Sequence, residues 1–270
     1  MSNKRICFFL HYFPDPKIPL YVQYYLKELS HYFDEIRLIT NNRTLLNIPE
    51  NLLSELKIQF VTNEGYDFGM FYNGFKGINP DDYNQIACIN DSNLLLSRLE
   101  SFFENEKVNN ADFWGLIDSN ESPWFSNHEN SYHIQSHFLV FNKPSISALN
   151  EYMKMIDIKE LFEEKNQKQL RRKIIHEWEI GVSQYLIRNG MKGTSIFNSS
   201  RLLEKYNVKG QNATHSLYEE LLAEGYPLLK KKIVTAKRLK LISTKPKIKK
   251  LITRYGYPEW DLIKALDEIV

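Results

Sequence analysis

The chain has 270 residues, of which 43% are hydrophobic and 13% aromatic, a composition typical of globular rather than disordered proteins. No apolar run approaches the roughly 20 residues that a membrane-spanning helix needs, and no signal-peptide cleavage pattern follows the apolar N-terminal stretch, so we expect a cytoplasmic protein. The net charge of +2 conceals a basic C-terminal stretch, because residues 225–258 contain 11 Lys or Arg and no Asp or Glu.

Short β-rich runs alternate with helical patterns over the first 120 residues. Strands are expected at residues 5–10, 36–40, 58–62, 85–90 and 111–118. Helices are expected after the first strand with Pro19 in its first turn, at residues 68–75, and from about residue 93 to 104. Because these strands are apolar enough to be covered on both faces, the pattern predicts an α/β fold with a mostly parallel sheet flanked by helices. Cys7 and Cys88 fall in two of the strands, which indicates neither a disulfide framework nor a thiolate metal site.

The pattern changes after residue 120. Tyr132–Phe141 predicts a strand with one polar face formed by His133, Gln135 and His137, which either lines a site or faces water. Helices are expected at 146–156 and 168–189, a short strand at 193–198, and mostly helical, basic chain from residue 200. We therefore divide the chain into a domain at residues 1–199 and a helical basic region at residues 200–270.

Three polar clusters stand at the ends of expected strands. They are Asn63 to Gly69, Asn90-Asp91-Ser92, and Asp118-Ser119. In open α/β sheets ligands bind outside the carboxyl ends of the strands, so the clusters predict a pocket for a cation or a polyhydroxylated ligand. Each cluster also has a structural interpretation: a helix cap at Asp91 or Ser92, a turn at the glycines, and an ordinary loop at Asp118.

Two further carboxylates, Glu177 and Glu179, lie in "HEWEIGVSQYLIRNG". Two residues apart on a helix, they point in nearly opposite directions and do not serve the same site. Glu179 borders the apolar stripe more closely, so of the two it is the one expected half-buried at a cleft, where its pKa would rise toward that of a general base. Spacing alone favours the alternative, a solvated glutamate on the helix face.

Six segments together resemble a known family. In chain order they are "NEGYDFGMFYNGF", "IACINDSN", "DFWGLIDS", "HIQSHFLVFNKP", "EWEIGVSQYLIRNG" and "YPLLKK". They resemble motifs of the rhamnan synthesis F family, bacterial polysaccharide glycosyltransferases similar to the GT-A fold of inverting enzymes. The resemblance implies a GT-A-like catalytic domain that binds a nucleotide sugar, with the C-terminal region near the acceptor or the membrane.

The resemblance also implies a donor site. In GT-A enzymes an acid after a core strand meets the donor diphosphate, usually through a divalent cation, and Asp91 stands there as the expected ligand of Mg²⁺ or Mn²⁺. Only one acid is present, so a site that uses Lys, Arg or backbone N–H donors instead stays open. The implied donor-binding residues are His11, Asn63, Gly65, Asp67, Gly69, Asn90, Asp91 and Ser92.

The resemblance assigns the remaining roles as follows. Glu179 matches the catalytic base, with Glu177 and Asp118 as alternatives. The acceptor, a glycan or lipid-linked glycan, is expected to contact Gln135, Ser136 and His137. The implied donor is a nucleotide-activated 6-deoxysugar such as dTDP-rhamnose, by analogy alone.

The basic residues at 229–254 have two interpretations. They dock the protein on the anionic inner face of the plasma membrane, or they form a solvated helix face packed on the core. Nucleic acid is not an expected partner, because the aromatic residues that stack on single strands are missing from this stretch. Two other function classes stay open: a non-catalytic sugar-nucleotide or glycan-binding module, and a peripheral membrane scaffold.

Overall fold

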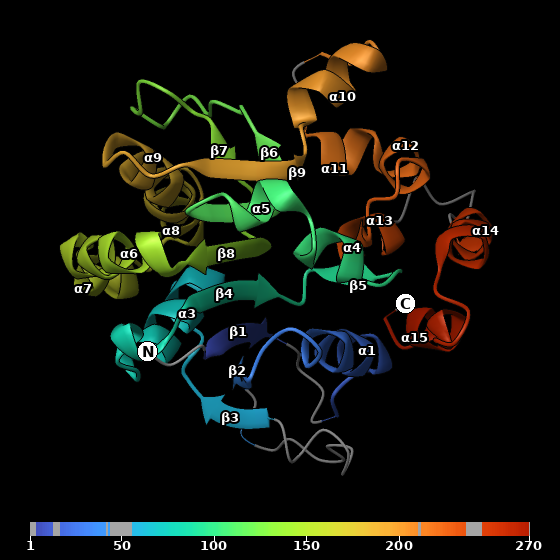
Figure 1. Cartoon of the computed structure of the whole chain (residues 1–270), viewed down its shortest axis with the longest axis horizontal. Helices are drawn as coiled ribbons and strands as arrows, with labels where there is room; N and C mark the ends of the chain where they lie inside the picture. Colours follow the sequence, from blue (N-terminus) through green and yellow to red (C-terminus); the bar gives the residue numbers. More distant parts are fainter. Residues whose placement is uncertain are drawn as a thin grey trace.

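The computed structural model describes residues 4–12, 17–41, 43, 56–209, 212–235 and 245–269. Its strands are β1 (Arg5–His11), β2 (Glu35–Thr40), β3 (Leu56–Phe60), β4 (Gln85–Asn90), β5 (Asn93–Leu95), β6 (Phe113–Ser119), β7 (His133–Ile134), β8 (Phe138–Asn142), β9 (Gly193–Phe197) and β10 (Leu228–Lys230). The main sheet has eight strands in the order β3-β2-β1-β4-β8-β6-β7, with β9 paired to β6 (Figure 1). Strands β3, β2, β1 and β4 are mutually parallel, as are β6 and β9, whereas β8 runs antiparallel between β4 and β6. The mostly parallel α/β sheet is confirmed.

Helices cover both faces of this sheet. They are α1 (Leu20–Leu29), α3 (Tyr66–Lys76), α4 (Glu100–Phe103), α5 (Glu106–Asn109), α6 (Lys143–Met155), α7 (Ile158–Glu163), α8 (Gln167–Ile174), α9 (Gly181–Arg188), α10 (Ser199–Lys205), α11 (Ala213–Ser216), α12 (Tyr218–Ala223), α13 (Lys231–Val234), α14 (Lys245–Tyr255) and α15 (Leu262–Asp267), with a 3-10 turn η1 (Pro80–Asp82) and a π-helical segment η2 (Ile175–Ile180). None of the helices in the described part of the chain is long and apolar enough to cross a bilayer.

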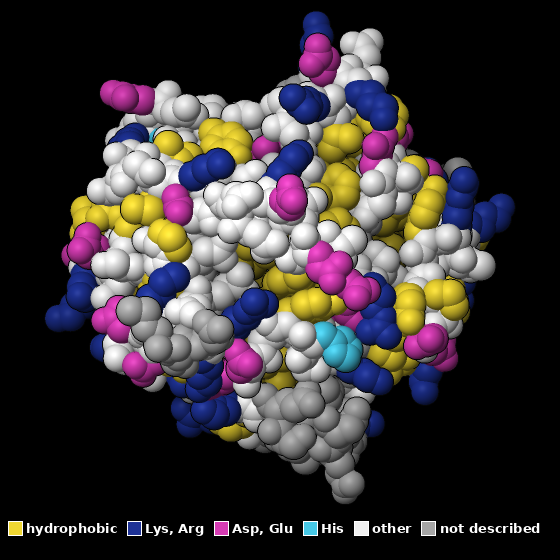
Figure 2. All heavy atoms as spheres, viewed as in Figure 1, with side chains coloured by type: hydrophobic (Ala, Val, Ile, Leu, Met, Phe, Trp, Pro, Cys, Tyr) yellow, Lys and Arg dark blue, Asp and Glu magenta, His cyan; other side chains and the backbone are white. Residues whose placement is uncertain are grey.

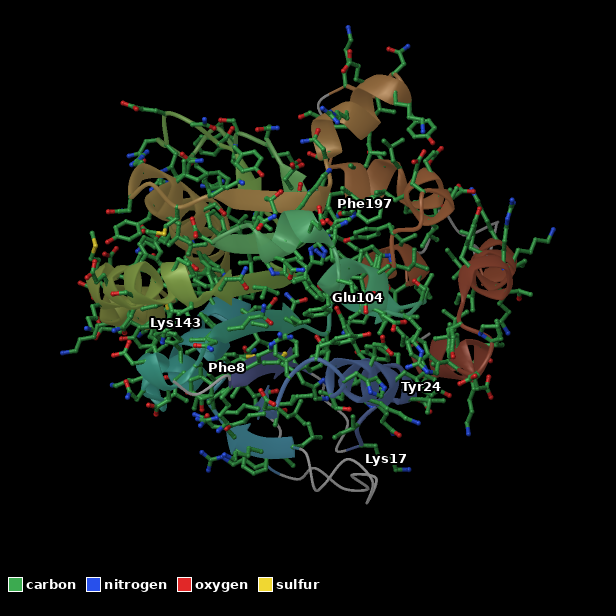
Figure 3. All side chains as sticks on the ribbon, in the orientation of Figure 1. Phe8, Lys17, Tyr24, Glu104, Lys143 and Phe197 are labelled. Carbon is green, nitrogen blue, oxygen red and sulfur yellow. The ribbon has the colours of Figure 1, made fainter. Side chains whose placement is uncertain are left out.

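Two apolar cores lie on opposite faces of the sheet. Alternate residues of β1 divide between them: Cys7 and Phe9 pack with α1 and the C-terminal helices, while Phe8 packs with α3, α6 and α9. The Phe8 ring, labelled in Figure 3, meets Phe71 of α3 edge-on with centroids 5.5 Å apart. Successive strand residues point to opposite faces, so a strand that is apolar at every position requires this two-sided cover.

The expected helix at residues 93–104 is wrong over its first half. Asn93–Leu95 instead forms β5, which pairs antiparallel with β10 from the C-terminal part of the chain. Leu94, Leu95 and Leu96 are all buried. A helix turns by about 100° per residue and would direct three consecutive side chains over a wide arc, so this fully apolar run suits an extended segment enclosed on both sides.

The single strand expected over Tyr132–Phe141 is also wrong. The chain forms β7, a turn at residues 135–137, and then β8. The amide of Gln135 donates to the carbonyl of Ile117 and ends the β7–β6 pairing, so the alternation of faces does not continue through the turn. The three polar side chains of this segment consequently do not face water and are buried.

Residues beyond 199 contribute to the same core as the sheet. Leu221, Leu229 and Leu266 pack in the cluster that holds Cys7 and Phe9. Figure 3 shows Phe197 where β9 meets the C-terminal helices, and its ring lies 5.2 Å from that of Tyr226. Residues 236–244, part of the basic segment, lie outside the described residues.

Candidate active site

A cavity of about 910 Å³ opens at the carboxyl ends of β4 and β6. Its wall brings together residues from distant parts of the chain: Asp67, Asn90, Ser92, Ser119, Glu121, Phe125, His133, Gln135, Ser136, His137, Arg171, Glu179, Ser199, Asn212, His215, Lys230 and Lys232. Both the volume and the position outside the strand ends are typical of small-molecule sites in α/β folds. Seven of the residues expected at the site lie here, namely Asp67, Asn90, Ser92, Gln135, Ser136, His137 and Glu179.

Asp67 and Asn90 form one hydrogen-bonded unit in this wall. The Asn90 side-chain NH₂ group donates to the Asp67 carboxylate at 2.6 Å. The side-chain oxygen of Asn90, Oδ1, accepts from the backbone amide of Ser92 at 3.1 Å. Burial raises the pKa of Asp67 to about 7, and the charges of Asp91 and Glu179 contribute to that shift. These hydrogen bonds fix the orientation of the Asp67 carboxylate and the Asn90 amide before a ligand binds.

The two glycines of the same cluster serve the backbone. Gly65 is the N-cap of α3 with φ 71°, a left-handed conformation that favours glycine. A Cβ on Gly69 would lie 1.7 Å from the carbonyl oxygen of Glu64, so only glycine fits there. Neither glycine lines the cavity, and Asn63 lies exposed in the preceding loop, also away from the wall. Their placement favours the turn interpretation over contact with a ligand.

Glu179 projects into the cavity from η2. Burial raises the pKa of Glu179 above its usual range, while electrostatic interaction with His133, Lys230 and Arg171 opposes the shift. Glu177 does not line the cavity, and its side chain is 44% exposed with His176 3.9 Å away. Of the two glutamates, η2 therefore presents only Glu179 to the cavity.

Asp91 lies just behind the cavity wall in a buried ion pair. Its Oδ2 is 3.0 Å from His11 Nδ1, 3.2 Å from Lys231 Nζ and 3.3 Å from the Tyr21 hydroxyl. Removing one partner from a buried ion pair destabilises a protein by about 3–5 kcal/mol, so a cation at this oxygen would compete with an established network. His11 is likewise buried, contacts Asp91 and does not line the cavity.

These residues do not fit a divalent cation held directly by Asp91. Among the residues that the structure describes, no three His, Cys, Asp or Glu side chains are grouped so that they could hold a metal ion. One oxygen of Asp91, Oδ2, already contacts both a histidine and a lysine.

Asp118 has a structural role. Its Oδ2 accepts from the Ser195 hydroxyl at 2.8 Å and from the Asn198 amide at 3.0 Å, while Oδ1 accepts from the backbone amide of Ser199 at 2.7 Å. It is buried and does not line the main cavity. The carboxylate ties the end of β6 to the start of α10, and both of its oxygens accept hydrogen bonds there.

The turn between β7 and β8 supplies the remaining expected residues. Gln135, Ser136 and His137 all line the cavity, although a regular strand would have pointed neighbours in opposite directions. His137 Nε2 is 2.7 Å from the Tyr226 hydroxyl, and burial lowers the pKa of its imidazole. His137 is thus a neutral, buried hydrogen-bonding group, and Gln135 and Ser136 remain the polar groups available to a ligand.

Several residues of the wall escaped the reasoning from sequence. The additional charged and aromatic members are Glu121, Phe125, Arg171, His215, Lys230 and Lys232. Lys230 is of special interest, because burial lowers its pKa to about 8 while Glu179 opposes the shift. Lys230 lies in the motif "YPLLKK", which carries the family resemblance, and in the basic stretch 229–254, for which membrane docking and a solvated helix face both stayed open.

Residues 37–265 match the family model described as "Rhamnan synthesis protein F". The chain belongs to this family. The rhamnan synthesis F family is a polysaccharide synthesis family, and the match spans most of the chain, including both sides of the cavity.

Curated relatives add distant similarity. The Virulence protein VirA of Vibrio anguillarum is 24% identical over 194 residues, which are 64% of this chain and 60% of that protein. The matched region thus spans well under the full length of the relative.

Solved structures that match the chain include glycosyltransferases. The apo-form glycosyltransferase GlyE of Streptococcus pneumoniae TIGR4 has a TM-score of 0.45 and 13% identity, covering 99% of this chain and 63% of that chain. The galactosyltransferase LgtC, solved with donor and acceptor sugar analogs, has a TM-score of 0.44 and 12% identity, covering 96% of this chain and 99% of that chain.

Proposed function

We propose that this rhamnan synthesis F family member is an inverting glycosyltransferase that moves a sugar from a nucleotide-sugar donor to a growing bacterial surface polysaccharide. The observation that carries the proposal is the position of Glu179, half-buried in the same cavity as the Asp67–Asn90 pair. A carboxylate with a raised pKa, in a pocket at the strand ends, is suited to act as a general base. Family membership supports polysaccharide synthesis as the setting.

In the proposed reaction Glu179 accepts the proton of an acceptor hydroxyl. The hydroxyl oxygen attacks the anomeric carbon from the face opposite the diphosphate and forms the new C–O bond. The bond from the anomeric carbon to the phosphate oxygen breaks, and the nucleoside diphosphate leaves with the electron pair. One displacement inverts the anomeric configuration through an oxocarbenium-like transition state, as in glycoside hydrolysis.

The cavity wall offers polar groups to both substrates. Asp67, Asn90 and Ser92 offer carboxyl, amide and hydroxyl groups to the donor, and Gln135 and Ser136 offer polar groups to the acceptor glycan. We propose a 6-deoxysugar donor such as dTDP-rhamnose by analogy with the family's name.

Contact of residues 229–254 with an anionic membrane surface stays a prediction. Figure 2 shows acidic and basic side chains interspersed over the face it presents.

The decisive experiment compares Glu179→Gln with Glu177→Gln, the same change two residues away. We expect Glu179→Gln to reduce sugar transfer about 100-fold or more, because no base then takes the proton, while donor binding measured by thermal shift persists. Glu177→Gln should transfer at the wild-type rate. Full activity in folded Glu179→Gln would remove the base assignment. Donor binding by the wild type with neither transfer nor donor hydrolysis would identify a non-catalytic binding module.

A further inference from the structure

Three consecutive lysines reach the site through the pairing of β5 with β10. Lys230 is in register with Asn93, and the backbone amide of Lys231 donates to the carbonyl of Ser92 at 2.9 Å. Asn93 and Ser92 follow directly on the strand end that carries Asp91. The C-terminal segment is thereby held by backbone bonds against the end of β4, where a donor diphosphate is expected.

The three lysines divide between two environments. Lys231 Nζ lies 3.2 Å from Asp91 and 2.8 Å from the Tyr21 hydroxyl, on the far side of the wall. Lys230 and Lys232 line the cavity. Lys230 is the extended N-cap residue at the end of β10, and Lys231 and Lys232 begin α13, where successive side chains point about 100° apart. One lysine neutralises Asp91 and the other two present their charge to a ligand.

The charge of this cavity edge matches a diphosphate. Lys230 and Lys232 together offer two positive charges, which equal the charge of one divalent cation. An ammonium group is a compact point charge with three donors and is a common ligand of phosphate oxygens. When the bond to the sugar breaks, negative charge grows on the leaving phosphate oxygen, and positive groups fixed beforehand stabilise that charge without rearrangement.

We propose that Lys230 and Lys232 bind the diphosphate of the donor directly and supply the positive charge expected from a divalent cation, with Lys231 held in place by Asp91. This inference rests on the proposed glycosyltransferase function. It changes the role of Asp91 from a metal ligand to an anchor for the lysine segment. It also assigns the first and third lysines of the basic C-terminal stretch to the donor site rather than to a membrane surface.

The test measures binding of inorganic pyrophosphate by thermal shift, in EDTA and in Mg²⁺ or Mn²⁺. We expect pyrophosphate to stabilise the wild type equally in both buffers. UDP, GDP and dTDP are then titrated in EDTA, and we expect at least one of them to compete with pyrophosphate. Lys230→Gln and Lys232→Gln should each weaken pyrophosphate binding roughly tenfold or more, since each removes one charged donor. Lys250→Gln, an exposed lysine on α14, is the matched control and should bind normally.

Three outcomes would overturn the inference. The first is stabilisation by pyrophosphate that disappears in EDTA and returns with Mn²⁺, which leaves the glycosyltransferase proposal intact. The second is unchanged binding in a folded Lys230→Gln, Lys232→Gln double variant. The third is that pyrophosphate binds but no nucleoside diphosphate displaces it. That result is expected if the lysines hold a lipid-linked diphosphate instead. Failure of every nucleoside diphosphate to bind in either buffer would contradict the proposed function itself.

Discussion

Glu179 and Lys230 face the same cavity, and burial moves their pKa values toward each other. The pKa of the Glu179 carboxyl is raised and that of the Lys230 ammonium is lowered to about 8. Each group favours the ionised form of the other, because opposite charges nearby offset part of the cost of desolvation. The proposed reaction needs Glu179 ionised to accept a proton and Lys230 protonated to hold the diphosphate.

These two requirements predict a bell-shaped dependence of kcat/KM on pH. Activity should fall toward acid as Glu179 gains a proton, at a pH above that of an ordinary glutamate. It should also fall toward alkaline near pH 8, as Lys230 loses its proton. Lys230→Arg keeps the charge at high pH and should remove the alkaline limb. Persistence of that limb in active Lys230→Arg would show that another group titrates there.

At the scale of elements, η2 determines where Glu179 points. A π-helical turn inserts an extra residue into a helix and shifts the side chains that follow. The Tyr152 hydroxyl donates to the carbonyl of Glu177, and His128 Nε2 lies 3.0 Å from the carbonyl of His176. A Cβ on Gly181 would lie 2.4 Å from the Tyr152 hydroxyl, so glycine at the end of the segment permits this approach. Tyr152 is therefore a positioning residue for the proposed base.

Tyr152→Phe removes the hydroxyl that holds the carbonyl of Glu177. We expect transfer to slow roughly tenfold and the acid limb of the pH profile to move, because Glu179 no longer occupies the same buried position. Binding of pyrophosphate should not change. Tyr185→Phe is the matched control. It removes the same hydroxyl group from a ring that lies 4.9 Å from that of Tyr152. Equal effects of the two substitutions would argue for general loosening of the helix rather than for positioning.

For the whole molecule, the question is whether the residues beyond 199 form a separate unit. β10 completes a sheet with β5, and Leu221, Leu229 and Leu266 pack in the core that holds Cys7 of β1. α14 buries Ile248 and Ile252 against that core, and Lys247 and Lys249 pair with Glu219 and Asp267. The C-terminal helices thus cover one face of the sheet and also deliver two lysines to the cavity.

A chain truncated after residue 199 should consequently fail to fold on its own. Removal of residues 200–270 exposes Leu94, Leu95 and the apolar face of α1. Burial of each such side chain contributes about 1.5–3 kcal/mol to the free energy of unfolding. The soluble yield of the 1–199 fragment, and whether it unfolds cooperatively on heating, measure whether it folds. Truncation after residue 255 removes only α15 and serves as the milder comparison. A cooperative, soluble 1–199 fragment would support the division of the chain at residue 199.

Local patterns in the sequence were sufficient for the strands of the parallel half and for part of the site. β1, β2 and β4 follow from short apolar runs, because burial on both faces leaves a signal within a few residues. Glu179 could be preferred to Glu177 for the same reason, since helix periodicity relates each one to a nearby apolar stripe.

Tertiary structure alone decided the partners of the remaining acids. Asp91 is paired with Lys231, and Asp118 is tied to Ser195 and Asn198, through residues far away in the chain. The β5–β10 pairing brings the lysines to the strand end and joins two short segments far apart in the chain. The sequence pattern of neither segment identifies the other as its partner. A basic run on its own is compatible with a membrane surface or a phosphate site, and only the fold determines which charges it meets.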